Sequence, residues 1–143
     1  MKSIDVKGTA RTVTGKKATR EIRKSGSIPC NLYGEKRGEN GLPVALGFSV
    51  TAAEVRNLVY SPDIYSVNLN IDGQEYKAVM KELQFHPVTD QLLHIDFYEI
   101  TEEKPIVMEV PIKLNGLAEG VKAGGKLAAS VRNLKVRAPY TQI

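Results

Sequence analysis

A β-hairpin is predicted by the segment IYSVNLNIDGQEYKAVMKELQF, residues 64–85. On both sides of Asp72-Gly73, β-branched and aromatic residues alternate with polar ones, which is typical of strands with one buried face. An Asp-Gly pair favours the type I′ turn, whose twist matches that of two antiparallel strands. The two strands of this hairpin are therefore expected at 64–71 and 74–85.

Similar patterns elsewhere predict further strands. They are expected at 4–13 (with Gly8 as a bulge), 27–34, 43–50 and 91–100, with a polar loop at 35–42 and a turn at 86–90. Alternation assigns the faces of two of these strands. Facing one way, toward the interior, are Ile28, Cys30, Leu32, Leu93, Ile95 and Phe97. Facing the other way are Asn31, Tyr33, His94, Asp96 and Tyr98.

Two helices are expected between these strands. The first follows Gly15 and ends at Gly26, a favourable residue after a helix C-terminus, and Pro29 prevents its continuation. The second begins after Thr51 as its N-cap, with Glu54 at its third position. Short strands and two helices favour an α+β fold that is mainly β, either a small antiparallel β-barrel or a sandwich with helices over its open parts.

The composition changes after Tyr98, where the acidic segment EITEEKP begins. It precedes two strand-like runs, at 106–116 and 126–138, that flank the glycine-rich segment GLAEGVKAGG, expected to be a flexible or tight-turning connection. We therefore expect a first β-domain at 1–98, a linker at 99–104, and a second β-domain at 105–143. About 40 residues seldom fold alone, so the second unit is expected to be partial, or to lean on the first unit or on a partner.

Composition restricts the function classes. The 143-residue chain has no apolar run that could cross a bilayer, and MKSIDVKGTA has no apolar signal core, so a cytoplasmic location is expected. The single cysteine, Cys30, cannot form an internal disulfide, and its setting favours a small buried side chain over a reactive thiol. The net charge is +4, but residues 1–41 hold ten basic and four acidic residues. Such a distribution is typical of a polyanion-binding face, although a basic N-terminal arm would have the same composition.

The basic residues of the first helix lie largely on one side of it. At 100° per residue, an arc of about 100° holds Lys16, Arg20, Arg23 and Lys24, with Lys17 at its margin and Ala18 and Ile22 opposite. An arginine guanidinium can hold two phosphate oxygens at once. A phosphate-binding ridge and a merely solvated helix face both fit this pattern.

The strand at 91–100 adds a second polar feature. His94 and Asp96 point to the same outer face. A carboxylate next to a polyanion is favourable only if it accepts hydrogen bonds from base amino groups, such as N2 of guanine in a minor groove. That groove is wide and shallow in A-form RNA, and Tyr33 is placed to stack or hydrogen-bond there. A cross-strand His–Asp pair on a hydrated sheet is the equally simple alternative.

Other kinds of site fit less well. The spacing of His86, Asp90, His94 and Asp96 matches no typical zinc site, so we expect no metal. No serine or cysteine stands in a nucleophile setting beside His94, and GLAEGVKAGG lacks the features of a P-loop or a dinucleotide fold. We therefore expect neither a cofactor nor an enzymatic activity.

Three segments carry a resemblance to a known family: GKKATREIRKSGSIPCNLYG, LQFHPVTDQLLHIDF and VPIKLNGLAEGVKAGGKL. In this order, and over residues 2–137, the chain resembles the bacterial ribosomal proteins that bind 5S rRNA, the twenty-fifth of the large subunit. That family includes the longer, two-domain form known as general stress protein CTC. The resemblance implies a small β-barrel that docks on the minor groove of the loop E region of 5S rRNA.

The resemblance also implies which residues bind the RNA. The matching positions are Arg11, Lys16, Arg20, Arg23, Tyr33, Lys81, Gln84, His94 and Asp96. Two departures affect this set: Glu21 stands where some relatives have a second arginine, and Lys81 stands where a glutamine occurs in relatives, which favours a phosphate as its partner. The implied protein is monomeric in the ribosome and binds no DNA or membrane, and residues 105–143 are expected to contact other large-subunit components. A cytoplasmic stress adaptor that binds proteins through its second domain is the alternative.

Overall fold

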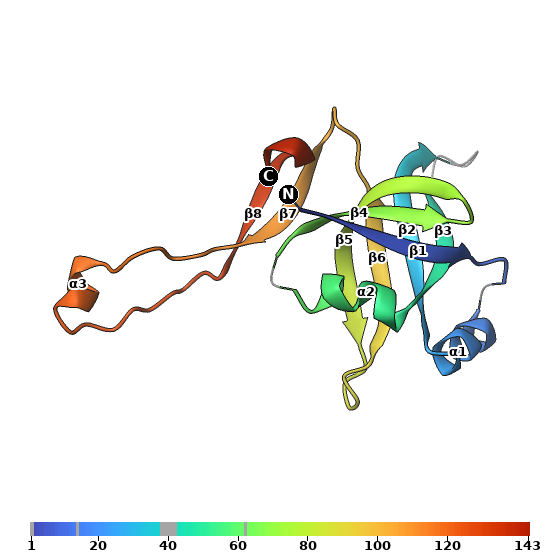
Figure 1. Ribbon diagram of the computed structural model, residues 1–143, viewed down its shortest axis with the longest axis horizontal. Helices are drawn as coiled ribbons and strands as arrows, with labels where there is room; N and C mark the ends of the chain where they lie inside the picture. The colour runs from blue at the N-terminus through green and yellow to red at the C-terminus, as the bar shows by residue number, and fades with distance from the viewer. Residues whose placement is uncertain (1, 14, 38–42, 62) are drawn as a thin grey trace.

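Six strands close into a β-barrel in the computed structural model, which describes residues 2–13, 15–37, 43–61 and 63–143 (Figure 1). These strands are β1 (Lys2–Ala10), β2 (Ser27–Arg37), β3 (Pro43–Thr51), β4 (Tyr65–Ile71), β5 (Gln74–Phe85) and β6 (Leu92–Glu99). Their order around the barrel is β1-β3-β2-β6-β5-β4. The predicted mainly β fold is confirmed, and of the two architectures considered the barrel is the one that forms.

Two of the neighbouring strand pairs are parallel. β1 runs parallel to β4, with Val6 opposite Leu69, and β2 runs parallel to β6, with Asn31 opposite Asp96. The other four pairs are antiparallel, so the barrel is mixed, and the expectation of a purely antiparallel barrel is wrong in this detail. Parallel neighbours require a long crossover between the two strands, which both pairs have. Because of the β2–β6 pairing, the strand that leaves the basic helix lies beside the strand that carries His94 and Asp96.

Both predicted barrel-domain helices are present. α1 (Lys16–Lys24) follows Gly15 and is terminated beyond Ser25 by Gly26, whose φ of 81° is in the left-handed region. α2 (Ala52–Val59) has Thr51 as its N-cap and packs against the barrel through two buried side chains, Val55 and Leu58. Within the described part of the chain, no helix is long and apolar enough to cross a membrane.

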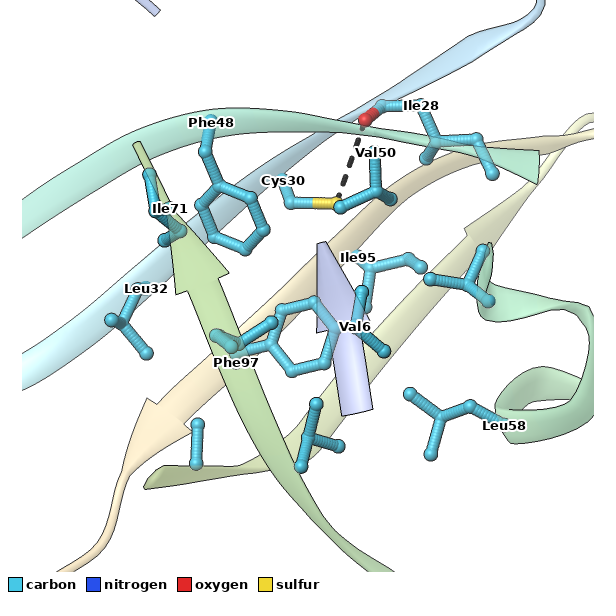
Figure 2. Close-up of a cluster of buried hydrophobic side chains, with 14 residues drawn as sticks. Val6, Ile28, Cys30, Leu32, Phe48, Val50, Leu58, Ile71, Ile95 and Phe97 are labelled. Carbon is cyan, nitrogen blue, oxygen red and sulfur yellow. Dashed lines mark hydrogen bonds between the residues drawn. The ribbon is translucent and has the colours of Figure 1, made fainter. Parts of the chain in front are cut away.

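The interior of the barrel is filled by apolar side chains from every strand and from α2 (Figure 2). Phe48 and Phe97 lie at its centre, with ring centroids 5.8 Å apart. Cys30 is fully buried among them, and its thiol donates to the carbonyl oxygen of Ile28 at 3.5 Å. Burial raises the pKa of this thiol to about 12, which agrees with the expected role as a small core residue.

The predicted hairpin is confirmed. Asp72 and Gly73 have φ angles of 49° and 85°, and a type I′ turn requires positive φ at both positions. The predicted bulge at Gly8 is wrong, because β1 pairs with β4 without interruption as far as Gly8. A side chain is disfavoured there for another reason: a Cβ atom at Gly8 would lie 2.9 Å from Cδ2 of Phe48.

Two further details of the strands differ from expectation. β2 continues to Arg37, three residues into the predicted loop at 35–42, and the rest of that loop lies outside the described residues. In β6, Leu92 packs against the core, although Leu93 was the residue expected to face inward. The register between β5 and β6 shifts twice, once between Gln84 and Phe85, so simple alternation fails at this end of the strand.

The C-terminal residues form a hairpin-like extension from the barrel (Figure 1). Its elements are β7 (Pro105–Pro111), α3 (Glu119–Lys122), β8 (Asn133–Pro139) and the 3₁₀ turn η1 (Tyr140–Gln142). The glycine-rich segment thus contains one helical turn, α3, where only a connection was expected. Four buried residues, Val79, Ile100, Ile106 and Tyr140, join the base of the extension to β5. The extension therefore leans on the barrel, one of the arrangements expected for so short a segment.

Candidate nucleic-acid interface

Arg23 connects the basic helix α1 to strand β6. Its Nε and Nη2 atoms both donate to the carbonyl oxygen of Leu93, at 3.2 and 3.1 Å. The RNA-binding hypothesis requires that the helix and the outer face of β6 lie side by side. This contact shows that they do, because Leu93 immediately precedes His94 in the chain.

The cationic side of α1 faces solvent. Ala18 and Ile22 are half-buried against the barrel, as the helical periodicity predicts. The exposed side chains are Lys16, Lys17, Arg20, Arg23 and Lys24. Among the described residues, none of these five forms an ion pair. The ridge is therefore available to phosphate groups.

A row of residues crosses the outer face of the barrel beside this helix. Asn31 of β2 is the register partner of Gly47 in β3 and of Asp96 in β6. Asp96 is in turn opposite Glu82 of β5. Arg11 extends the row at its other end, because its backbone N–H donates to the Gly47 carbonyl oxygen at 2.9 Å. Residues distant in sequence thus form one continuous polar surface.

His94 and Asp96 lie together on this surface. The His94 Nδ1 atom is 3.3 Å from Oδ1 of Asp96, and both side chains are more than four-fifths buried. Burial is the main cause that lowers the pKa of His94, and the nearby Asp96 carboxylate opposes it. The imidazole is consequently neutral at pH 7. No hydrogen bond joins the two atoms, and Oδ1 of Asp96, which is buried, has no hydrogen-bond partner among the described residues.

Arg11 holds the opposite side of the face. Its Nη2 atom donates to Oγ1 of Thr19 in α1 at 3.4 Å, so this arginine also ties the helix to the barrel. Its Nε atom is buried and, within the described residues, has no hydrogen-bond partner. An unpaired buried donor and an unpaired buried acceptor on one face are unusual in a folded protein. Such groups need a partner, which an ordered water or a ligand would supply.

The remaining predicted residues divide into two groups. Tyr33 follows Asn31 on the same face, and its Oη atom accepts a hydrogen bond from Nδ2 of Asn31 at 3.3 Å. Gln84 is exposed opposite His94. Lys81 points elsewhere: its ammonium group donates to the carbonyl oxygen of Val107 in β7 at 2.8 Å. The structure thus brings all of the predicted residues except Lys81 to one surface, and the contact of each of the nine with RNA stays a prediction.

Asn31, Gly47 and Glu82 belong to the face but were not among the predicted binding residues. Alternation had placed Asn31 on the outer face of its strand, and an amide in the apolar run IPCNLY was the available signal. Gly47 and Glu82 become visible only through the register with their neighbours. No group of three or more His, Cys, Asp or Glu side chains that could hold a metal ion occurs in the described parts of the chain.

Comparison with known proteins places the chain in a family. The model of the Ribosomal L25p family matches residues 6–97. A protein of Phocaeicola vulgatus named large ribosomal subunit protein bL25 is 63% identical over 143 residues, which are all of this chain and 72% of that protein. Proteins of the same name from Bacteroides thetaiotaomicron and Porphyromonas gingivalis are 56% and 54% identical, again over all of this chain and 72% of theirs. The chain therefore belongs to the Ribosomal L25p family.

Proposed function

We propose that this protein binds 5S rRNA at the minor groove of the loop E region, through the cationic side of α1 and the outer face of β2 and β6. The observation that carries the proposal is the contact of Arg23 with the Leu93 carbonyl oxygen, which makes one continuous surface of the helix and the strand. As a member of a bacterial ribosomal protein family, the chain is a structural component of the large subunit in the cytoplasm and not an enzyme.

The two parts of this surface have different tasks. The exposed cations of α1 neutralise phosphates and release counterions, which supplies affinity without sequence preference. The barrel face has no positive charge where it carries His94, Asn31 and Asp96, so it suits the groove floor better than the phosphate backbone. The Asp96 carboxylate is about one-fifth exposed, and its buried Oδ1 atom lacks a hydrogen bond within the described residues; the N2 amino group of guanine is a minor-groove donor for such a carboxylate.

Binding of the pure protein to 5S rRNA tests the proposal. If about five phosphates are neutralised, the plot of log K against log salt should have a slope of about −3.5 to −4.5. Footprinting should show protection in loop E. A slope near zero, or protection confined to other regions, would contradict the proposal.

Two variants separate the two tasks. Arg20→Ala should weaken binding to 5S rRNA and to unrelated structured RNA alike, because it removes a phosphate contact. Asp96→Ala should mainly reduce the preference for loop E, by roughly 1–3 kcal/mol, the usual range for a base contact. Arg137→Ala on β8 is the control for Arg20, since it removes an equal charge at an exposed position outside the face. Equal losses for specific and unspecific RNA in Asp96→Ala would refute its assignment.

The extension suggests additional contacts within the subunit. Between β7 and β8, large apolar side chains are exposed at Ile112, Leu114, Leu117, Leu127 and Val131. Exposed apolar residues in such number favour contact with another surface. We include other large-subunit components among the partners of residues 105–143. Co-sedimentation of the protein with large subunits in high salt tests these contacts. A stress adaptor that is held on the ribosome only by its basic face would be released under these conditions.

A further inference from the structure

We propose that Asn31 is a specificity-determining residue of the RNA-binding face, and that with Asp96 it recognises the minor-groove edge of a guanine. The inference rests on the proposed RNA-binding function and goes beyond it, since it assigns a base-reading role to a side chain that neither sequence pattern nor resemblance selected. It depends on the register partners of Asn31, on the hydrogen bonds that its amide makes, and on the glycine beside it, Gly47.

Asn31 occupies the centre of the polar row. It is the register partner of Asp96 on one side and of Gly47 on the other. Neighbouring strands lie about 4.8 Å apart, so the amide and the carboxylate stand side by side on the outer surface. A base edge lying across β2 and β6 would meet both of them at once.

The amide of Asn31 is held in place but only partly used. One N–H of Nδ2 donates to Oη of Tyr33 at 3.3 Å, which orients the side chain along the strand. Among the described residues, its second N–H and its Oδ1 atom have no hydrogen-bond partner. The row therefore places a free donor from Asn31 next to the Asp96 carboxylate, which is about one-fifth exposed and whose buried Oδ1 atom has no hydrogen-bond partner within the described residues.

This pair matches guanine. The minor-groove edge of guanine carries the N2 amino donor beside the N3 acceptor. Asp96 accepts from N2, and the free N–H of Asn31 donates to N3. An adenine in the same place would leave Asp96 without its hydrogen bond, so the pair distinguishes the two purines.

Gly47 places no side chain on the row beside Asn31. A Cβ atom at this position would have ordinary contacts of 3.8 Å with Cβ of Arg11 and with Oδ1 of Asn31. Packing therefore does not require the glycine. The missing side chain instead leaves the row low between Arg11 and Asn31, and we expect the edge of a base or a ribose to approach the row there.

The test uses the full chain and synthetic loop E RNA in which single guanines are replaced by 3-deazaguanine, which lacks the N3 acceptor. For the unaltered protein, one replacement should weaken binding roughly three- to tenfold. Asn31→Ala should bind unmodified RNA more weakly by a similar factor and lose nothing further with that modified RNA. Asn57→Ala, the same change at an exposed position on α2, should behave as the unaltered protein does.

The outcomes distinguish this inference from the proposed function. Suppose that the unaltered protein binds loop E, and that the 3-deazaguanine replacement weakens RNA binding by the same factor for Asn31→Ala as for the unaltered protein. The role of Asn31 is then refuted, and RNA binding stands. If the unaltered protein does not bind loop E, both fail. Thermal unfolding shows whether Asn31→Ala is folded. If Asn31→Ala is not folded, Gly47→Leu provides the test: its side chain should cover the row beside Asn31 and remove the sensitivity to 3-deazaguanine, whereas Gly47→Ala should fold normally. Retained sensitivity in a folded Gly47→Leu would overturn the inference.

Discussion

Arg20 and Arg23 lie on the same side of α1, yet the structure predicts different consequences for the same substitution. Both are exposed and both are expected to contact phosphate. Within the described residues, only Arg23 has an intramolecular acceptor, the carbonyl oxygen of Leu93, at 3.1 and 3.2 Å. Arg20→Gln should therefore affect RNA binding alone, whereas Arg23→Gln should affect both RNA binding and the stability of the fold.

The expected magnitudes follow from these contacts. Loss of one phosphate contact should make the slope of log K against log salt less steep by about 0.7–0.9, which corresponds to about five- to eightfold weaker binding in 0.1 M salt. Both variants should show this. The exposed, charge-assisted hydrogen bonds of Arg23 should contribute about 1 kcal/mol to the free energy of unfolding. For a chain of this size, that loss lowers the Tm by about 3–4 °C.

Fluorescence anisotropy with labelled 5S rRNA over a series of salt concentrations measures the slope, and circular dichroism measures the Tm. Because the two variants differ only in the position of the lost charge, each is the control for the other. An equal fall in Tm for both would show that the Leu93 contact does not hold the helix. An unchanged slope in both would show that this side of α1 is not the phosphate-binding surface.

Three further expectations concern the fold. Burial holds the pKa of His94 below its ordinary value of 6.5, so the unfolded chain binds more protons than the folded one as the pH falls below that value. The contribution of His94 to the free energy of unfolding should thus be full above about pH 6.5 and be lost as the pH falls through the folded pKa. Urea unfolding of His94→Gln should show a free energy of unfolding that depends less on pH in this range. An unchanged pH dependence would contradict the lowered pKa of His94. Gly8→Ala places a methyl group against Phe48 and should cost about 1–3 kcal/mol, measured as a lower urea midpoint; no change would mean that the core yields freely. Tyr140→Ala removes a buried ring and its 2.8 Å hydrogen bond from Lys77. Amide hydrogens of β7 and β8 should then exchange faster while those of β4 do not, and uniform acceleration would argue against an extension held mainly at its base.

Local features of this protein were predictable because they depend on residues close in sequence. The turn at Asp72-Gly73 needs two residues with positive φ, and Asp-Gly is a pair that accepts it. The ends of α1 and α2 follow from Gly26 and Thr51, whose effects reach only a few positions. Strand alternation correctly placed Cys30 in the core for the same reason.

Features that depend on a partner strand were not predictable in this way. Gly8 was interpreted as a bulge, but its role is to admit Phe48 from β3, a contact 40 positions away in the chain. The inward residue at the start of β6 is Leu92, because the register with β5 shifts beside it. A side-chain pattern within one strand contains no information on where its neighbour shifts register.

In the candidate site, too, local features were predictable from the sequence and long-range features were not. The order of residues alone determined that α1 has a cationic side and that His94 and Asp96 share an outer face, because helix and strand periodicity are properties of the local backbone. Only the tertiary structure decided that these two surfaces are one. The parallel pairing of β2 with β6 places Asn31 beside Asp96, and the Leu93 carbonyl oxygen binds Arg23. Such long-range pairings form because closing the barrel buries all of its apolar faces together, a condition that no single segment can satisfy.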